Sequence, residues 1–219
     1  MIDTLLHKTT EILVSNEAVL LPEDRYSDMK YPSLLPLMHF HVDQYDLKGF
    51  GHIMSMHTTT KMGMELLTVS FMPSELPDLP YLLIDAMSMK KKRCVFVEYY
   101  GCGRDGFNDA GLKEVYDKWK GLPDYEEKDN WYIRERMPYS LIKSGGENEL
   151  SAMALDSVRA YLGAFPSCRT DPAYEDQLRD FRERMIRLGN PSSKTLRLLL
   201  KEDGAREFME NVIMPLNKE

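Results

Sequence analysis

Cysteine is scarce in this sequence. The three cysteines, Cys94, Cys102 and Cys168, form no CxxC pair. Their odd number and irregular spacing argue against a disulfide framework. We therefore expect reduced thiols, a cytoplasmic location and a fold held together by its hydrophobic core.

Long hydrophobic segments are also missing. No stretch approaches the roughly 18 consecutive apolar residues of a membrane helix, and the opening MIDTLLHKTTEIL lacks the basic-then-apolar order of a secretion signal. Internal repeats and low-complexity tails are absent. With 219 residues, of which 43% are apolar, the sequence predicts a single domain over residues 1–219 that stays in solution and does not bind membranes.

The balance of charge is negative. A formal net charge of −7 argues against nucleic acid or another long polyanion as a partner. Positive charge is nevertheless concentrated in two places, KKKR at residues 90–93 and the segment 179–197. A local basic patch can still bind a small anionic partner.

The first half of the sequence changes from a helical period to a period of two. Apolar residues at helical spacing predict an amphipathic helix over residues 3–15, and the proline-containing LPEDRYSDMKYPSLLP at 21–36 predicts a long surface connection. From 38 to 100, short β-prone runs follow each other too closely for crossover helices. They predict an antiparallel meander.

The second half is mainly helical in pattern. A helix is expected after Asp109, a strand within 131–143, a helix from about Leu150, a helix from Asp171-Pro172 to Gly189, and two short helices over 193–202 and 205–213. Strands followed by helices indicate the α+β class, with helices packed on the sheet.

One carboxylate interrupts an apolar strand. PYLLIDAM, residues 80–87, has the composition of a buried strand, yet Asp85 lies in its middle. A buried carboxylate must be paired, protonated or chemically active. A structural role, with Asp85 bonded to backbone amides, is the simplest alternative.

Other motifs are weaker. His39 and His41 lie two apart on one strand, with His52 and His57 on a neighbouring run, but no pattern of cysteines or acids completes a metal site, so no metal is expected. GCGRDG at 101–106 lacks the features of a phosphate loop and indicates a turn. KKKR is consistent with a charged hairpin turn or with a docking patch.

Two segments resemble a known family. The closing segment RERMIRLGNPSSKTLRLLLKEDGAREFMENVIMPL, residues 182–216, resembles that of the ferredoxin-dependent bilin reductases, with its Lys-Thr motif, short helix, break and final apolar helix. MELLTVSFMPSELPDLPYLLIDAM, residues 64–87, is similar to the central strands of the family, which carry an aspartate at the position of Asp85.

The resemblance implies a fold and a reaction. The fold is a three-layer α/β/α sandwich with a central antiparallel sheet, and the open-chain tetrapyrrole lies between the sheet and the C-terminal helices. No cofactor is bound, because ferredoxin supplies electrons singly and the protein supplies the protons. Asp85 corresponds to the proton donor, and desolvation by its apolar neighbours favours its protonated form.

The sequence departs from the family at two proton-handling positions. Thr68 stands where many members have histidine, and Ser193 stands where they have aspartate. Thr68 is thereby left in a supporting role beside Asp85.

Basic residues of the motif remain. Lys194 and Arg197 match basic positions, and Lys194 is the stronger candidate for binding a propionate by charge-assisted hydrogen bonds. Arg134 or Arg136 is the candidate for the second propionate, and both are also consistent with solvated strand residues.

Three functions follow from these observations. The first is an enzyme that reduces a linear tetrapyrrole, with a ferredoxin steered to the cavity by Lys90, Lys91, Lys92 and Arg93. The second is a non-catalytic protein of the same fold that binds a tetrapyrrole or another hydrophobic anion. The third is a structural protein with a vacant pocket, against which the retained Asp85 and Lys194 argue.

Overall fold

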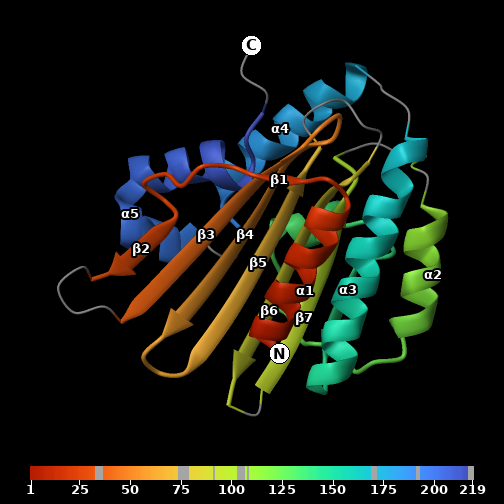
Figure 1. Ribbon diagram of the computed structural model, residues 1–219, viewed down its shortest axis with the longest axis horizontal. Coiled ribbons are helices and arrows are strands. Elements are labelled where there is room, and N and C mark those ends of the chain that lie inside the picture. Colours follow the sequence, from red (N-terminus) through yellow and green to blue (C-terminus); the bar gives the residue numbers. More distant parts are fainter. Residues whose placement is uncertain are drawn as a thin grey trace.

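One antiparallel sheet forms the middle layer of the molecule (Figure 1). The computed structural model describes residues 1–32, 37–73, 79–90, 92–102, 107, 109–168, 172–190 and 193–216. Within these residues the sheet has eight strands, which are β1 (Val19–Leu20), β2 (Asp28–Tyr31), β3 (Met38–Leu47), β4 (Gly51–Thr60), β5 (Met64–Met72), β6 (Tyr81–Met89), β7 (Lys92–Tyr100) and β8 (Leu141–Ser144). The predicted antiparallel arrangement over 38–100 is confirmed.

The order of the strands follows the chain closely. It is β1-β3-β4-β5-β6-β7-β8, and β2 also pairs with β3. Short turns join β3 to β4 and β4 to β5, and Gly49 and Gly63 take the left-handed φ values of +77° and +74° in these two turns. Glycine adopts this region without the steric penalty of a side chain.

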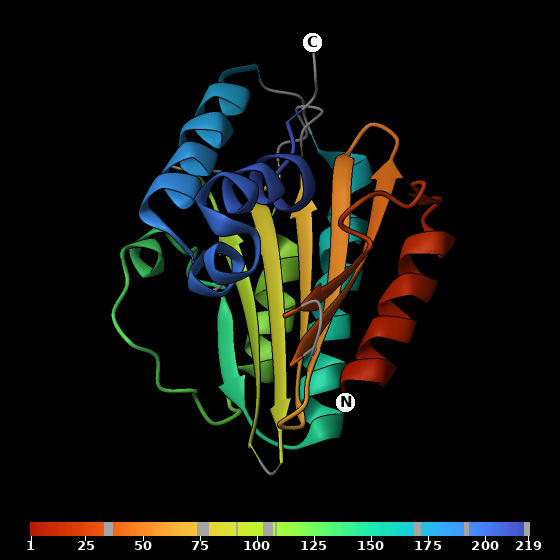
Figure 2. The same ribbon diagram turned by 90° about the vertical axis from the view of Figure 1, so that its left-hand side faces the viewer.

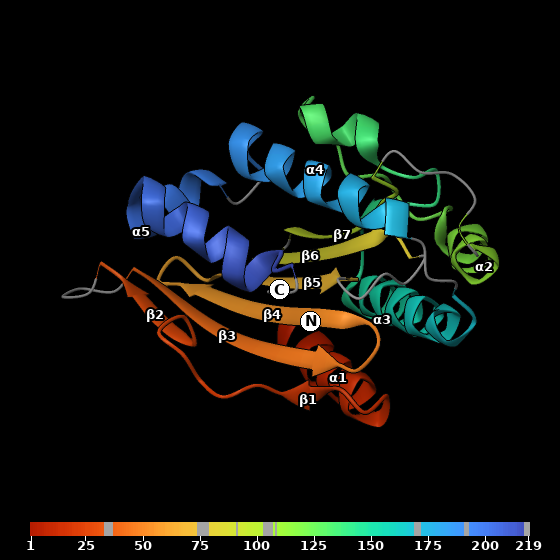
Figure 3. The ribbon, with the colours of Figure 1, turned by 90° about the horizontal axis from the view of Figure 1, so that it is seen from above.

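Helices cover both faces of the sheet, as seen from above in Figure 3. One layer contains α1 (Ile2–Ser15), α2 (Ala110–Trp119) and α3 (Glu147–Ala164). The other contains α4 (Pro172–Leu188), α5 (Ser193–Phe208) and the π-helical turn η3 (Met209–Ile213). The expected three-layer α/β/α sandwich is therefore confirmed.

Each face of the sheet has its own hydrophobic core. Strand alternation divides β6 between them, because Leu82, Ile84 and Ala86 are buried on the α1 and α3 side, while Tyr81 and Leu83 are buried on the α4 and α5 side. Asp85 shares the face of Tyr81 and Leu83 by the same period of two. The alternation thus directs its carboxylate toward the C-terminal helices.

Several local expectations need correction. The segment 21–36 is more than a surface connection, because β2 pairs with the edge of β3. The expected break at 203–204 lies earlier, at Lys201, where φ is 64° within α5. The strand expected within 131–143 is present as β8, and a 3₁₀ turn, η1 (Trp131–Glu135), precedes it. Asp171 lies outside the described residues.

In the described part of the chain, no helix combines the length and the apolar character that crossing a bilayer demands.

Candidate functional site

A cavity of about 450 Å³ lies on the α4 and α5 side of the sheet. Figure 2 looks onto this face, where α5 crosses the strands and the segment between α2 and β8 runs along one side. β3 to β7 form the floor, Thr195 and Leu196 of α5 contribute at one end, and residues 125–136 form a wall at the other. The volume is within the range of pockets that bind small organic molecules.

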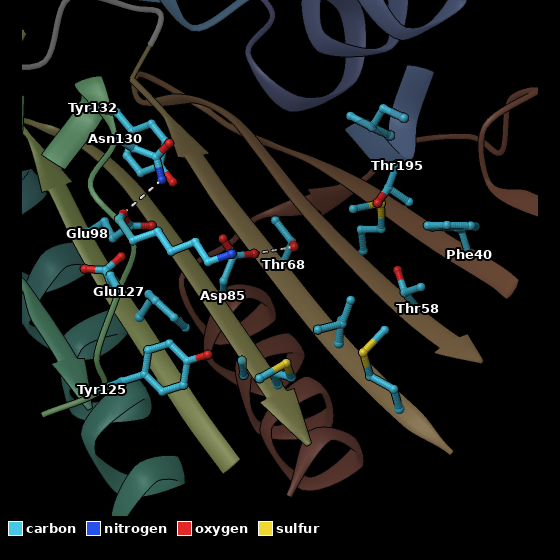
Figure 4. Close-up of a pocket in the computed structure, with 18 of the residues that line it drawn as sticks. Phe40, Thr58, Thr68, Asp85, Glu98, Tyr125, Glu127, Asn130, Tyr132 and Thr195 are labelled. Carbon is cyan, nitrogen blue, oxygen red and sulfur yellow. Dashed lines mark hydrogen bonds between the residues drawn. The ribbon is translucent and has the colours of Figure 1, made fainter. Parts of the chain in front are cut away.

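The cavity has an apolar part and an acidic part. The apolar part is lined by methionine, leucine and aromatic side chains, namely Met38, Phe40, Met56, Met64, Leu66, Met87 and Phe96. In Figure 4, Asp85 and Thr68 lie between Glu98 and Glu127 at one end and Phe40 at the other. A flat apolar ligand that filled the cavity would therefore lie over Asp85 and Thr68.

Asp85 and Thr68 form a pair across two neighbouring strands. They are direct partners in the β5–β6 register, and the Thr68 hydroxyl donates a 2.5 Å hydrogen bond to Asp85 Oδ1. Desolvation raises the pKa of Asp85 from 3.8 to about 6, opposed by the Thr68 hydrogen bond and by the charge of Arg136. Asp85 therefore holds its proton to a higher pH than an ordinary carboxyl group does, and its partner is a hydroxyl group rather than backbone amides.

The raised pKa makes Asp85 a cost to stability when it ionises. A carboxyl group whose pKa is higher in the folded state than in the unfolded state binds its proton more tightly in the folded state. The stabilisation that Asp85 gives the folded state is therefore fully present below pH 3.8 and is lost as the pH rises through about 6. We expect Asp85→Asn to match the wild type near pH 3.5 and to be more stable at pH 7, by about 3 kcal/mol. Urea denaturation at several pH values measures this difference.

Asp117→Asn is the matched control for this experiment. Asp117 is an exposed carboxylate on α2, and hydrogen bonds from Lys113 and Lys120 lower its pKa to about 2. The effect of pH on stability is therefore opposite to that of Asp85, because the stabilisation from Asp117 is present above its unfolded pKa and is lost as the pH falls toward 2. Asp117→Asn should therefore show no gain at pH 7. A gain in both variants would contradict the assignment to the cavity.

A second buried carboxylate, Glu98, belongs to an ionic cluster at the acidic end. Arg136 donates from Nε to Glu98 Oε1 at 2.6 Å and from its two terminal nitrogens to Glu127, at 2.5 and 2.8 Å. Tyr100 donates a further hydrogen bond of 2.8 Å to Glu98 Oε1. The guanidinium is thus shared by two carboxylates, and the Arg136 side chain is only 8% exposed.

The environment of Glu98 favours its protonated form. The pKa of Glu98 is raised from 4.5 to about 7. Desolvation is the largest cause, the charge of Arg136 opposes it, and the nearby Asp85 adds to it. Glu98 is in register with Leu83, whereas Asp85 is in register with Phe96. The two acids are therefore diagonal neighbours on one face of adjacent strands, about 7–8 Å apart at Cα.

The expected propionate-binding residues lie in different places. Arg136 reaches the cavity but is engaged by the two glutamates, while Arg134 is exposed and is not among the residues that line it. Ser193 begins α5, where its Oγ accepts a 2.7 Å hydrogen bond from the backbone N–H of Asn190.

The two basic residues of the Lys-Thr motif are on α5. Arg197 is paired with Glu202 at 3.1 Å and lines a neighbouring hollow with Ser193. The backbone of Lys194 belongs to α5, but its side chain lies outside the description. Thr195 and Leu196, which the sequence did not single out, are the α5 residues that contact the cavity.

The basic turn joins β6 and β7 as a hairpin. Lys90 takes a left-handed φ of 55°, and Met89 pairs with Lys92. Lys90 and Lys92 are exposed, whereas Arg93 lies 3.8 Å from Glu147. Lys91 lies outside the described residues.

His39, His41 and His52 have polar partners, whereas the buried Nε2 of His57 has no hydrogen-bond partner among the described residues. His39 bonds Asp28 at 3.0 Å, His41 lies 3.4 Å from Asp43, and His52 bonds the Val212 carbonyl at 3.0 Å. Among the described residues, no group of three metal-ligating side chains is arranged to hold an ion.

Glu98 was missed by the sequence analysis, although a signal was present. RCVFVEYY, residues 93–100, is an apolar strand interrupted by a carboxylate, just as PYLLIDAM is. The criterion that singled out Asp85 applies equally to Glu98. Glu127 had no comparable signal, because it lies in an acidic loop segment.

The sheet and its two helical layers form the fold that the resemblance to the ferredoxin-dependent bilin reductases implied. Among solved structures, phytochromobilin synthase from tomato, crystallised in complex with biliverdin, shares this fold. The match has a TM-score of 0.79 at 15% identity and covers 97% of this chain and 82% of that one. No protein-family model and no curated protein matches the chain.

Proposed function

We propose that the protein reduces a linear tetrapyrrole, taking single electrons from a ferredoxin and a proton from Asp85. The observation that carries the proposal is the place of the Asp85–Thr68 pair in the middle of the cavity floor. The fold shared with a protein that binds biliverdin supports the class of ligand. In this proposal no cofactor is bound, and the donor is an external protein.

The chemistry assigned to Asp85 follows from its pKa. An acid with a pKa of about 6 is close enough to neutrality both to hold a proton and to release it. Its protonated form can donate a hydrogen bond to a carbonyl oxygen or a ring nitrogen of the ligand. Thr68, which donates to Oδ1, leaves Oδ2 as the oxygen that carries the proton.

The lining of the cavity suits the interior of a tetrapyrrole better than its propionates. The apolar floor accommodates conjugated rings, and methionines adapt to irregular ligand shapes. Carboxylates outnumber cations among the described lining residues, since Asp85, Glu98, Glu126 and Glu127 face only Lys128 and Arg136. Pyrrole N–H groups are therefore favoured inside, and we place the propionates at the edge, near Lys128 and Lys194.

The same charge distribution bears on the non-catalytic alternative. A hydrophobic anion enclosed in this cavity would meet the carboxylates of Asp85 and Glu98, which is unfavourable. A tetrapyrrole bound without reduction remains the alternative. We would titrate the purified protein with biliverdin, record the absorption spectrum, and then add reduced ferredoxin without oxygen. A spectral change on binding and a second change on reduction are expected; binding without the second change would favour the alternative.

The basic hairpin supports a place for the electron donor. Ferredoxins are typically acidic, so the net charge of −7 opposes their approach unless a local positive surface attracts them. Lys90 lies five residues beyond Asp85 along β6, about 15–20 Å away. Met64 and Met87 extend the cavity toward this end of the sheet. We propose that Lys90, Lys91, Lys92 and Arg93 steer the donor.

Charge reversal tests this docking surface. The Lys90→Glu/Lys92→Glu variant should reduce ferredoxin-driven turnover about tenfold at low salt and much less at high salt, with unchanged affinity for bilin. Stopped-flow kinetics at several ionic strengths measure the effect. Lys113→Glu/Lys118→Glu on α2 changes the net charge equally on the other side of the sheet. Equal losses in the two variants would place the donor elsewhere.

A further inference from the structure

Two acids rather than one are available to the proposed reaction. Reduction of one double bond takes two electrons and two protons. In the cavity, Asp85 is the acid in the middle of the floor, and Glu98 lies diagonally across from it on β7. A ligand that covers Asp85 therefore lies beside Glu98 as well.

The contacts of Glu98 fix one oxygen and leave the other for a proton. Among the described residues, the hydrogen bonds from Arg136 and Tyr100 both end on Oε1. Oε2 is thus the oxygen on which Glu98 can carry a proton. The two donors also hold the side chain in a single orientation, which suits a proton donor.

The charge of the cluster favours a bound proton. Glu98 and Glu127 share one guanidinium, so full ionisation leaves an excess negative charge beside Glu98, whose side chain is only 1% exposed. Asp85 adds another negative charge from the adjacent strand. Binding a proton on Glu98 removes the excess while Arg136 stays paired with Glu127.

We infer that Glu98 is a second proton donor of the cavity, which together with Asp85 supplies the two protons of one reduction. This inference rests on the proposed function. One π bond of the tetrapyrrole breaks and two bonds to hydrogen form, while two ferredoxin molecules each lose an electron. The O–H bonds of Asp85 and Glu98 break, and solvent protonates both carboxylates again.

The titration of Glu98 depends on the groups that face it. They come from β6, β7, the loop segment before η1, η1 itself and the residue that follows it, and they are Tyr81, Asp85, Tyr100, Glu127, Tyr132 and Arg136. The pKa of Glu98, raised to about 7, predicts loss of its proton as the pH rises through neutrality. Turnover that uses this proton should decline over the same range.

Infrared difference spectra of the ligand-free protein test the proton directly. Between pH 5 and pH 8, the wild type should lose the carbonyl absorption of two protonated carboxyls. Asp85→Asn and Glu98→Gln should each remove one of them. If Glu98→Gln leaves the difference spectrum unchanged, Glu98 releases no proton between pH 5 and pH 8 and the inference is overturned. This readout needs no bilin, so it stands even if the proposed function fails.

Turnover kinetics test the use of the proton. Glu98→Gln and Glu127→Gln each remove one carboxylate partner of Arg136, so a purely structural role predicts equal effects. We expect Glu98→Gln to reduce kcat by at least about tenfold more than Glu127→Gln, with similar KM, and to abolish the decline of kcat near pH 7. Equal losses, or an unchanged pH profile, would overturn the inference. If the wild-type protein binds bilin but reduced ferredoxin does not reduce the bound bilin, the proposed function fails by itself.

Discussion

Asp85→Asn should abolish reduction and preserve binding. Asparagine keeps the shape of the side chain and can still accept the Thr68 hydrogen bond, so affinity for biliverdin should stay within about threefold. It cannot donate a proton from an acid, and loss of a general acid costs about 100-fold or more in rate. Anaerobic single-turnover absorption measurements with reduced ferredoxin give both quantities.

Thr68→Val is the companion variant. It removes the hydroxyl that lowers the pKa of Asp85, so the acid should keep its proton to a higher pH. We expect a modest loss of rate and a shift of the pH profile to higher pH. Turnover by Asp85→Asn at the wild-type rate would remove Asp85 from the mechanism, whatever the behaviour of Thr68→Val.

Arg136→Met should be the most destabilising change at the cavity. The variant leaves Glu98 and Glu127 without their shared cation, and breaking a buried ion pair on one side costs about 3–5 kcal/mol. The loss should be large at pH 8 and smaller at pH 5, because the pKa of Glu98 is already near 7 and a proton then replaces the missing charge. Chemical denaturation at the two pH values measures it.

Two further variants define the source of that loss. Arg134→Met changes an exposed arginine two residues away and should alter stability by less than about 0.5 kcal/mol. Adding Glu98→Gln to Arg136→Met should recover part of the stability at pH 8, because the uncompensated carboxylate is gone. A loss that is independent of pH, with no recovery, would mean that Arg136 acts through packing alone.

The strands were predictable because their physical signal is local. Short β-prone runs that follow each other closely placed β3 to β7, and a charge within the apolar run of β6 singled out Asp85. The fold class followed from the order of strands and helices together with the family resemblance. The two-residue β1 and the polar β2 escaped notice, because such short strands depend on pairing with β3 rather than on their own pattern.

The acidic end of the cavity could not be predicted in the same way. Its cluster joins Glu98 on β7 to Arg136 and Glu127, which are 38 and 29 positions further along the chain. No periodicity connects these positions, and only the folded chain brings them together. In the sequence, Arg136 was therefore a candidate for binding a propionate, whereas in the structure its guanidinium is paired with carboxylates of the protein.

The alternation of β6 also restricts how this sequence can change in length. Adding or removing one residue between Tyr81 and Asp85 would turn the carboxylate into the core beneath α1 and α3 and turn Ile84 toward the cavity. Both cores and the site would be lost in one event. The β6–β7 turn has no such coupling, since extra residues there extend into solvent. Insertions and deletions are therefore compatible with this fold at the β6–β7 turn but not within β6. Within β6, the alternation of side chains between the two faces of the sheet fixes the direction in which Asp85 points.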